Sequence, residues 1–300
     1  MKGVPARAAA EHEVRHSRVE AGLWMLGASA AFAAVEGLGS LVPRGHSPYQ
    51  LVFVRYAVHL GLMLAVLGPR LGLSLVRTRR PAVQWIRSLL MLGMPACFIG
   101  AMGRMRGNEV WAVFWIAPLV AALGAAAAGD GRVPLRRWIA LLAGLAGAVV
   151  SWRPGIPAPG VGMLLTAGMA GCFAAYLVLT RALRSEPATT NVFYTALGVF
   201  LALGAVSPAF WTPLTARAFV PMAAVGIVGL GGLYALDKAL AGASVPAAAP
   251  LLYSQTAFAL PIAVLAGDRI GRSAMAGAAL VTASITLYAL AETRERRSVS

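Results

Sequence analysis

Residues 21–41 read AGLWMLGASAAFAAVEGLGSL, an apolar run with a single ionisable side chain, Glu36. An α-helix rises about 1.5 Å per residue, so a run of this length crosses the hydrocarbon core of a bilayer. The chain as a whole follows this pattern, with 59% hydrophobic residues, 12% charged residues and a mean hydropathy of +0.73. A soluble protein carries roughly twice that charged fraction. The sequence therefore predicts an integral membrane protein with little room for a soluble domain.

Ten apolar blocks can be marked along the chain, joined by short segments rich in Pro, Gly and Arg that suit turns between antiparallel helices. The blocks are 21–41, 50–67, 83–102, 110–129, 135–152, 159–183, 191–210, 219–240, 245–267 and 273–291. The predicted fold class is an all-α polytopic membrane protein with ten transmembrane helices. Residues 1–20 are polar and lack the apolar core and cleavage site of a signal peptide. Cys97 and Cys172 fall inside blocks and have no metal-ligand neighbour, so neither a disulfide framework nor a metal site is predicted.

The formal net charge of +15 comes from basic residues in the short connecting segments. With an even number of spans both termini share one side, and most Lys and Arg residues fall on that side when the spans alternate. The positive-inside rule then places both termini in the cytoplasm and the protein in the inner (plasma) membrane. Arg87 is counted among the cytoplasmic residues at the head of a span, while Arg55 lies within one. This arrangement explains the basic charge without a nucleic-acid partner.

An internal repeat divides the chain. Residues 101–130 align with residues 239–268 without a gap, and both segments contain an aromatic residue at the same place, Trp115 and Tyr253, before ending in Gly-Asp. Each half holds five spans, and an odd number requires the second half to enter the membrane in the opposite direction. The prediction is therefore two inverted five-helix repeats around a central cavity. The expected boundaries are a cytoplasmic tail at 1–19, the repeats at 20–155 and 156–291, and a second cytoplasmic tail at 292–300.

Scattered motifs suggest a family. They are Phe53-Val54-Arg55-Tyr56, Val76-Arg77-Thr78-Arg79-Arg80-Pro81, Trp85-Ile86-Arg87, Ala117-Pro118-Leu119 with the later Asp130, Ser151-Trp152-Arg153-Pro154-Gly155, and Ala249-Pro250-Leu251-Leu252-Tyr253 with the later Gly267-Asp268. With these motifs the chain resembles the EamA-like branch of the drug/metabolite transporter superfamily over residues 20–291. The resemblance implies a ten-helix bundle with cytoplasmic termini and alternating-access transport of a metabolite or drug-like solute. Close relatives carry a lysine one turn after the acid of span one. Here that turn offers Gly39 and Ser40, so no role of that lysine is transferred.

Three polar residues of the first two spans are candidates for substrate binding or coupling. A carboxyl inside a span is costly and normally functional, which singles out Glu36. Arg55 lies at the same predicted depth, so an ion pair between the two is expected, either as part of a site or as a structural contact. His59 lies one turn beyond Arg55 and either extends this site or packs as a hydrogen-bonded histidine.

Four further candidates come from the repeat. Trp115 in span four and its counterpart Tyr253 in span nine, with Gln255 close by, either flank a cavity or pack helices together. Tyr176 in span six lies near the counterpart position of Glu36. Asp237 and Lys238 are expected to lie near the cytoplasmic end of span eight, with Lys238 reaching the lipid headgroups.

Catalytic and phosphate-binding signatures are absent from the sequence. We therefore expect no enzyme activity, no cofactor and no metal. The predicted function is a secondary transporter of a small organic solute, in contact with membrane lipid and driven by a gradient, with protons as a candidate coupling ion. An intramembrane enzyme and a non-transporting scaffold are the alternatives. The enzyme would need a converging acid–base cluster, and the scaffold would have no reason to keep charges within its spans.

Overall fold

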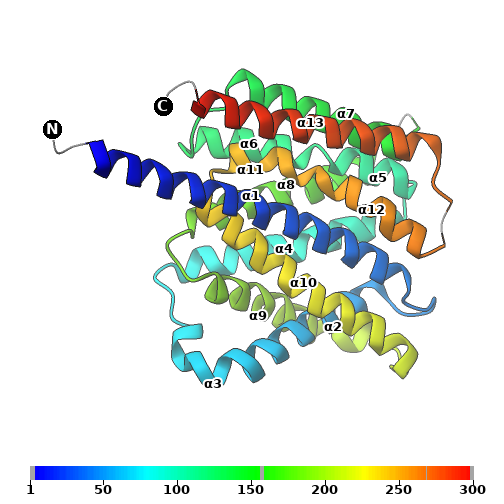
Figure 1. The fold of residues 1–300 in the computed structure, drawn as a ribbon. Helices are drawn as coiled ribbons and strands as arrows, with labels where there is room; N and C mark the ends of the chain where they lie inside the picture. The colour runs from blue at the N-terminus through cyan, green and yellow to red at the C-terminus, as the bar shows by residue number, and fades with distance from the viewer. Residues whose placement is uncertain (1–3, 156–158, 268, 298–300) are drawn as a thin grey trace.

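The computed structural model describes the backbone of residues 4–155, 159–267 and 269–297, and Asp268 of the second Gly-Asp motif lies outside this part of the chain. The described residues form helices joined by short turns and contain no strand (Figure 1). The helices are α1 (Val4–Ser40), α2 (Pro48–Leu62), η1 (Met63–Leu67), α3 (Gly68–Leu71), η2 (Gly72–Leu75), α4 (Pro81–Met102), α5 (Gly107–Phe114), α6 (Ala117–Ala127), α7 (Leu135–Trp152), α8 (Val161–Ala182), α9 (Ala188–Val206), η3 (Ser207–Ala209), α10 (Ala216–Gly242), α11 (Val245–Leu252), α12 (Ser254–Leu265) and α13 (Arg272–Arg297).

Ten stretches of the described chain are long and apolar enough to cross a membrane, which confirms the predicted number of spans. The first is Val19–Ser40, and α1 continues it as helix back to Val4, through most of the expected tail. The second runs from Pro48 to Leu75, beyond the predicted end at residue 67. Arg70, expected in a loop, therefore lies in the short helix α3 within this stretch.

Two predicted spans are broken near their middle. The fourth consists of α5 and α6 with a turn at Trp115 and Ile116, and the ninth consists of α11 and α12 with a turn at Tyr253. Pro118 explains the first break, because it lacks an N–H and its ring excludes the normal helical contact with the carbonyl four residues earlier. At the second break the Tyr253 N–H turns to the carbonyl of Pro250, only three residues back. The prediction of single helices over 110–129 and 245–267 was therefore wrong in this detail.

The helices pack in an order that differs from their order in the sequence. Helices α7 and α13 lie together at one side of the bundle and α2 and α9 at the other, while α10 lies between α1 and α2 (Figure 1). Glycines on α10 permit close approach: Gly226 and Gly229 face α2, and Gly232 faces Ala31 and Phe32 of α1. Small residues allow such contacts in membranes, where dispersion rather than the hydrophobic effect drives helix association.

Candidate functional site

Glu36 lies one turn before the end of α1 and is half-buried. Its Oε1 accepts a hydrogen bond from Nε2 of Gln255, the second residue of α12. The carboxyl group therefore lies at the amino end of a helix that begins inside a predicted span. Unpaired backbone N–H groups and the helix dipole favour negative charge at such a position. The structure thus brings together two candidate residues, Glu36 and Gln255, that are 219 positions apart in the chain.

Arg55 does not pair with Glu36, so the predicted ion pair was wrong. Among the described residues Arg55 makes no ion pair or hydrogen bond, and its Nε is buried without a partner. Its guanidinium carbon lies 5.3 Å from the centre of the Tyr56 ring. The group also lies against α10 at Gly229, where an added Cβ would be 2.9 Å from Nε. A side chain at position 229 would displace the guanidinium.

The two charges nevertheless lie at one level of the bundle, as the sequence predicts. Gly232 of α10 meets Phe32 of α1, and Gly229, one turn earlier, meets Arg55. Helix α1 runs in the opposite direction to α10 (Figure 1), so Glu36, one turn after Phe32, lies at the level of Gly229. Helices α1 and α2 both pack on α10. Glu36 and Arg55 therefore project from the two helices that flank α10.

His59 is fully buried and packs edge-on against Tyr56, with ring centres 4.9 Å apart. Neither ring nitrogen makes a hydrogen bond of ordinary geometry. His59 thus packs on the Arg55–Tyr56 segment of α2 and lies beside the Gly226 backbone of α10.

Trp115 and Tyr253 meet at the two helix breaks. The Tyr253 hydroxyl donates a hydrogen bond to the backbone carbonyl of Trp115 at 3.1 Å, and the ring centres are 5.7 Å apart. Both side chains are buried, and Gly144 of α7 lies directly against the Tyr253 ring. The two aromatics that the repeat aligns therefore pack against each other.

The structure contains a buried ion pair that was not predicted from the sequence. Arg87 contacts Asp237 at 3.1 Å, and their side chains are 0% and 1% exposed. Two guanidinium nitrogens reach the two carboxylate oxygens, while Nη2 also donates to the Tyr176 and Thr195 hydroxyls, each at 2.9 Å. Arg87, expected at the head of a span, and Asp237, expected near the end of one, do lie close to the ends of α4 and α10, but their side chains are buried inside the bundle. The candidate Tyr176 belongs to this cluster, whereas Glu36 packs on α12.

Amide side chains complete this cluster. Asn191 donates to Asp237 Oδ1 at 2.9 Å, and Gln84 donates to Asn191 at 2.6 Å. The cluster joins α4 to α8, α9 and α10. One signal in the sequence could have revealed it: Gln84, Arg87 and Ser88 have the i, i+3, i+4 spacing of one helix face, and all three are buried.

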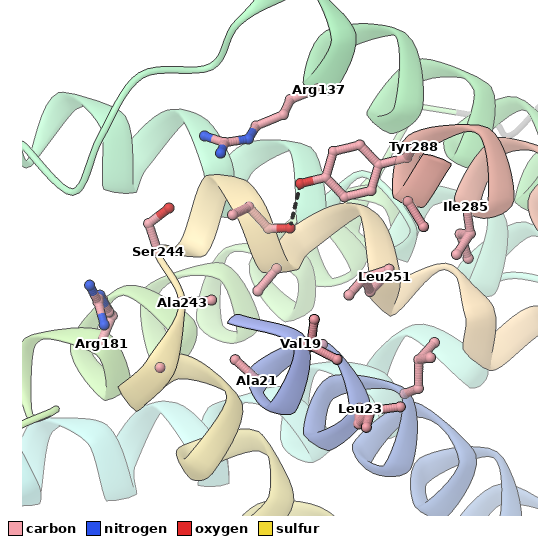
Figure 2. Close-up of a pocket in the computed structure, with 16 residues that line it drawn as sticks. Val19, Ala21, Leu23, Arg137, Arg181, Ala243, Ser244, Leu251, Ile285 and Tyr288 are labelled. Carbon is pink, nitrogen blue, oxygen red and sulfur yellow. Dashed lines mark hydrogen bonds between the residues drawn. The ribbon is translucent and has the colours of Figure 1, made fainter. Parts of the chain in front are cut away.

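A cavity of about 510 Å³ opens among α1, α7, α11 and α13, near the amino end of the first span (Figure 2). Leu23, Leu26 and Leu251 line its apolar part, and Arg137 and Ser244 contribute polar groups. The Tyr288 hydroxyl crosses it to donate to the Ala247 carbonyl at 3.0 Å. None of the seven candidate site residues lines this cavity. It reaches Leu251, two residues before the break at Tyr253.

Asp130 links helix ends beside this cavity through hydrogen bonds. Its carboxylate accepts from Arg181 at 2.8 Å and from the backbone N–H of Val245, the first residue of α11, also at 2.8 Å. The Gly-Asp motif thus anchors the end of α6 to the ends of α8 and α10–α11. Within the described chain, no three His, Cys, Asp or Glu side chains gather in a way that could hold a metal ion.

These features define a polytopic helical membrane protein with ionisable groups inside its spans. No protein-family profile matches the chain. The chain is 25% identical over 298 residues to the riboflavin transporter of Vibrio cholerae serotype O1, and the match covers 95% of this chain and 97% of that protein. A protein of known crystal structure superposes with a TM-score of 0.80 at 21% identity, covering 94% of this chain and 100% of the other. The second comparison shows a shared fold.

Proposed function

We propose that the protein is a secondary transporter of a small organic metabolite, and that a flavin such as riboflavin is the first solute to test. The observation that carries this proposal is the likeness to a riboflavin transporter over almost the full length of both chains. Intramembrane charges support it, because ionisable groups within spans commonly mark solute or ion pathways. A non-transporting scaffold gives no reason to keep Arg55 inside a span without an acidic partner.

The proposed architecture is two inverted repeats, 20–155 and 156–291, of the EamA-like kind. The turns at Trp115 and Tyr253 are separated by 138 residues, the offset of the sequence repeat. The packing also has matched pairs: α1 on α10 corresponds to α8 on α4, and α1 on α12 corresponds to α8 on α6. Gly93 of α4 faces Cys172 of α8 much as Gly232 of α10 faces Ala31 of α1. Such pairing is what a pseudo-twofold axis in the membrane plane produces.

The proposed mechanism is alternating access across the two helix breaks. The cavity reaches Leu251 on one side, while Glu36 lies farther along the first span, where Gln255 of α12 contacts it and Arg55 of α2 lies at its level. In the proposed mechanism the contact between Trp115 and Tyr253 separates the cavity from these groups. Rocking of one repeat against the other opens this contact and closes the opposite face. The gradient of a solute or ion supplies the energy, with protons as the candidate ion and Glu36 as the candidate carrier.

Uptake of labelled riboflavin into proteoliposomes tests the proposal. We expect accumulation above protein-free liposomes, exchange with unlabelled riboflavin trapped inside, and an altered initial rate when a pH gradient is imposed. Liposomes containing the Glu36→Gln protein serve as the matched control and should lose the effect of the gradient. Failure to transport any solute of a broad metabolite panel would remove the proposed function.

A further inference from the structure

Glu36 and Arg55 are an acidic and a basic side chain at the same level of the bundle, and no ion pair joins them among the described residues. Gln255 holds Glu36 toward α12, and the second carboxylate oxygen makes no hydrogen bond within the described residues. Gly229 leaves room for the Arg55 guanidinium on α10. Leaving two such charges without each other is costly in a low-dielectric interior, because pairing would offset part of their desolvation. Their separation therefore needs a reason.

The two groups have complementary chemistry. A carboxylate only accepts hydrogen bonds, and a guanidinium only donates them. A ligand that satisfies both must offer a hydrogen-bond donor with an acceptor oxygen beside it. A purely anionic ligand would be repelled by Glu36, and a purely cationic ligand by Arg55. Aromatic surfaces lie beside both charges: Phe32 is one turn from Glu36, and Tyr56 lies under Arg55.

We propose that Glu36 and Arg55 together bind a planar imide-bearing heterocycle, with its ring N–H donating to Glu36 and one flanking carbonyl oxygen accepting from Arg55. The isoalloxazine ring of riboflavin has this arrangement, since its N3–H lies between two carbonyls. The proposal rests on the proposed function and deepens it by naming the chemical group that the site reads. Gln255 acts as a positioning residue, because its hydrogen bond to Oε1 fixes the Glu36 carboxylate and leaves Oε2 for the ligand N–H.

The Glu36 contact is tested with riboflavin and 3-methylriboflavin, which lacks the imide N–H. Binding of each to the purified full-length protein in detergent is measured by calorimetry. We expect methylation to weaken binding to the unmodified protein by roughly tenfold or more, the effect of losing a hydrogen bond to a charged group. In Glu36→Ala the two flavins should bind within about threefold of each other, because the acceptor is gone. Ser40→Ala, one turn away, is the matched control and should keep the full difference.

The Arg55 contact is tested through α10. Gly229→Ala places a methyl group against the guanidinium, whereas position 231 faces open space. We expect Gly229→Ala to weaken both flavins by the same factor, at least fivefold, and Gly231→Ala to leave binding unchanged. These variants also keep the proposal testable if Glu36→Ala does not fold.

Three results would overturn the inference: equal binding of both flavins by the unmodified protein, a methylation penalty that survives in Glu36→Ala, or no riboflavin binding up to the limit of its solubility. Tight binding of benzoate or benzylamine, an anion and a cation without the imide, would also overturn it. These outcomes are separable from failure of transport. Flavin binding without transport in proteoliposomes removes the proposed function and leaves the imide site. Transport of a different solute class removes the imide site and leaves the proposed transporter function.

Discussion

Arg87 and Asp237 form an ion pair that water does not reach. Such a pair is tolerated only when the remaining donors and acceptors are satisfied, and here Tyr176, Asn191 and Thr195 supply those contacts. The residues come from α4 of the first half and from α8, α9 and α10 of the second. The cluster therefore ties the two halves together through polar contacts inside the bundle.

Removing one member of this pair should be far more damaging than removing both. Asp237→Asn leaves the buried Arg87 guanidinium without its partner, and Arg87→Gln leaves the buried Asp237 carboxylate without its partner. Such an uncompensated buried charge costs about 3–5 kcal/mol. We expect either single variant to lower the detergent unfolding temperature sharply. The double variant, which has no buried charge, should recover most of this loss. Fluorescence-monitored unfolding of the four proteins measures the coupling, and strictly additive losses would show that the pair does not stabilise the fold.

The sequence identified the charges inside the spans but not their partners. Glu36 and Arg55 stand out because they interrupt apolar runs, and that signal needs no three-dimensional information. Their partners depend on the rotation of each helix about its axis. That rotation brings the Glu36 side chain against α12 and the Arg55 side chain against α10. Arg87 was missed because it lies close to the start of its span, where an arginine usually reaches the headgroups. Only its spacing from Gln84 and Ser88 indicated an inward face.

At the scale of helices, the length of each apolar block was enough to predict ten spans. The breaks at Trp115 and Tyr253 were not predicted. Hydropathy averages over a window, so two short helices separated by a one- or two-residue turn look like one long helix. Pro118 and Pro250 were present as signals, but proline is also common in unbroken transmembrane helices.

The contact between α7 and α13 depends on two glycines. A Cβ at Gly277 of α13 would lie 2.5 Å from the backbone nitrogen of Ser151 in α7. Gly147 of α7 in turn lies directly against the backbone of α13. We expect Gly277→Ala to separate the helices and destabilise the protein by about 1–3 kcal/mol, the range for overpacking. Gly171→Ala of α8 is the control, because nothing lies near that position, and it should be neutral or stabilising. Equal unfolding temperatures for the two variants would contradict this close contact.

At the scale of the whole molecule, the orientation in the membrane is predicted from the distribution of charged residues and not from helix packing. The excess of Lys and Arg on one side predicts that the cavity and both termini face the cytoplasm. In a protein with Cys97 and Cys172 replaced by alanine, we place a cysteine at Arg44 between α1 and α2 or at Ser185 between α8 and α9. Both positions are exposed and lie at opposite ends of the spans.

A membrane-impermeant maleimide added to intact cells should label the cysteine at position 44 and not the one at 185. Labelling of position 185 should appear once the cells are lysed. The reverse pattern would place the termini and the cavity outside the cell. Labelling of both positions in intact cells would contradict the parity of the spans between them.

The cavity offers the sharpest test of movement across the whole bundle. Ala247 of α11 lines it and lies close to Leu251, next to the break at Tyr253. In the cysteine-free background we expect the cysteine of Ala247→Cys to react with an impermeant maleimide from the side of the termini, and the bulky adduct to abolish riboflavin exchange. The proposed alternating-access mechanism closes this cavity when the opposite face opens, so riboflavin supplied from that opposite side should change the rate of modification. Ser185→Cys lies on the same side outside the cavity, and its modification should leave exchange intact. A reaction rate at position 247 that is unaffected by solute would mean that the cavity does not open and close during transport.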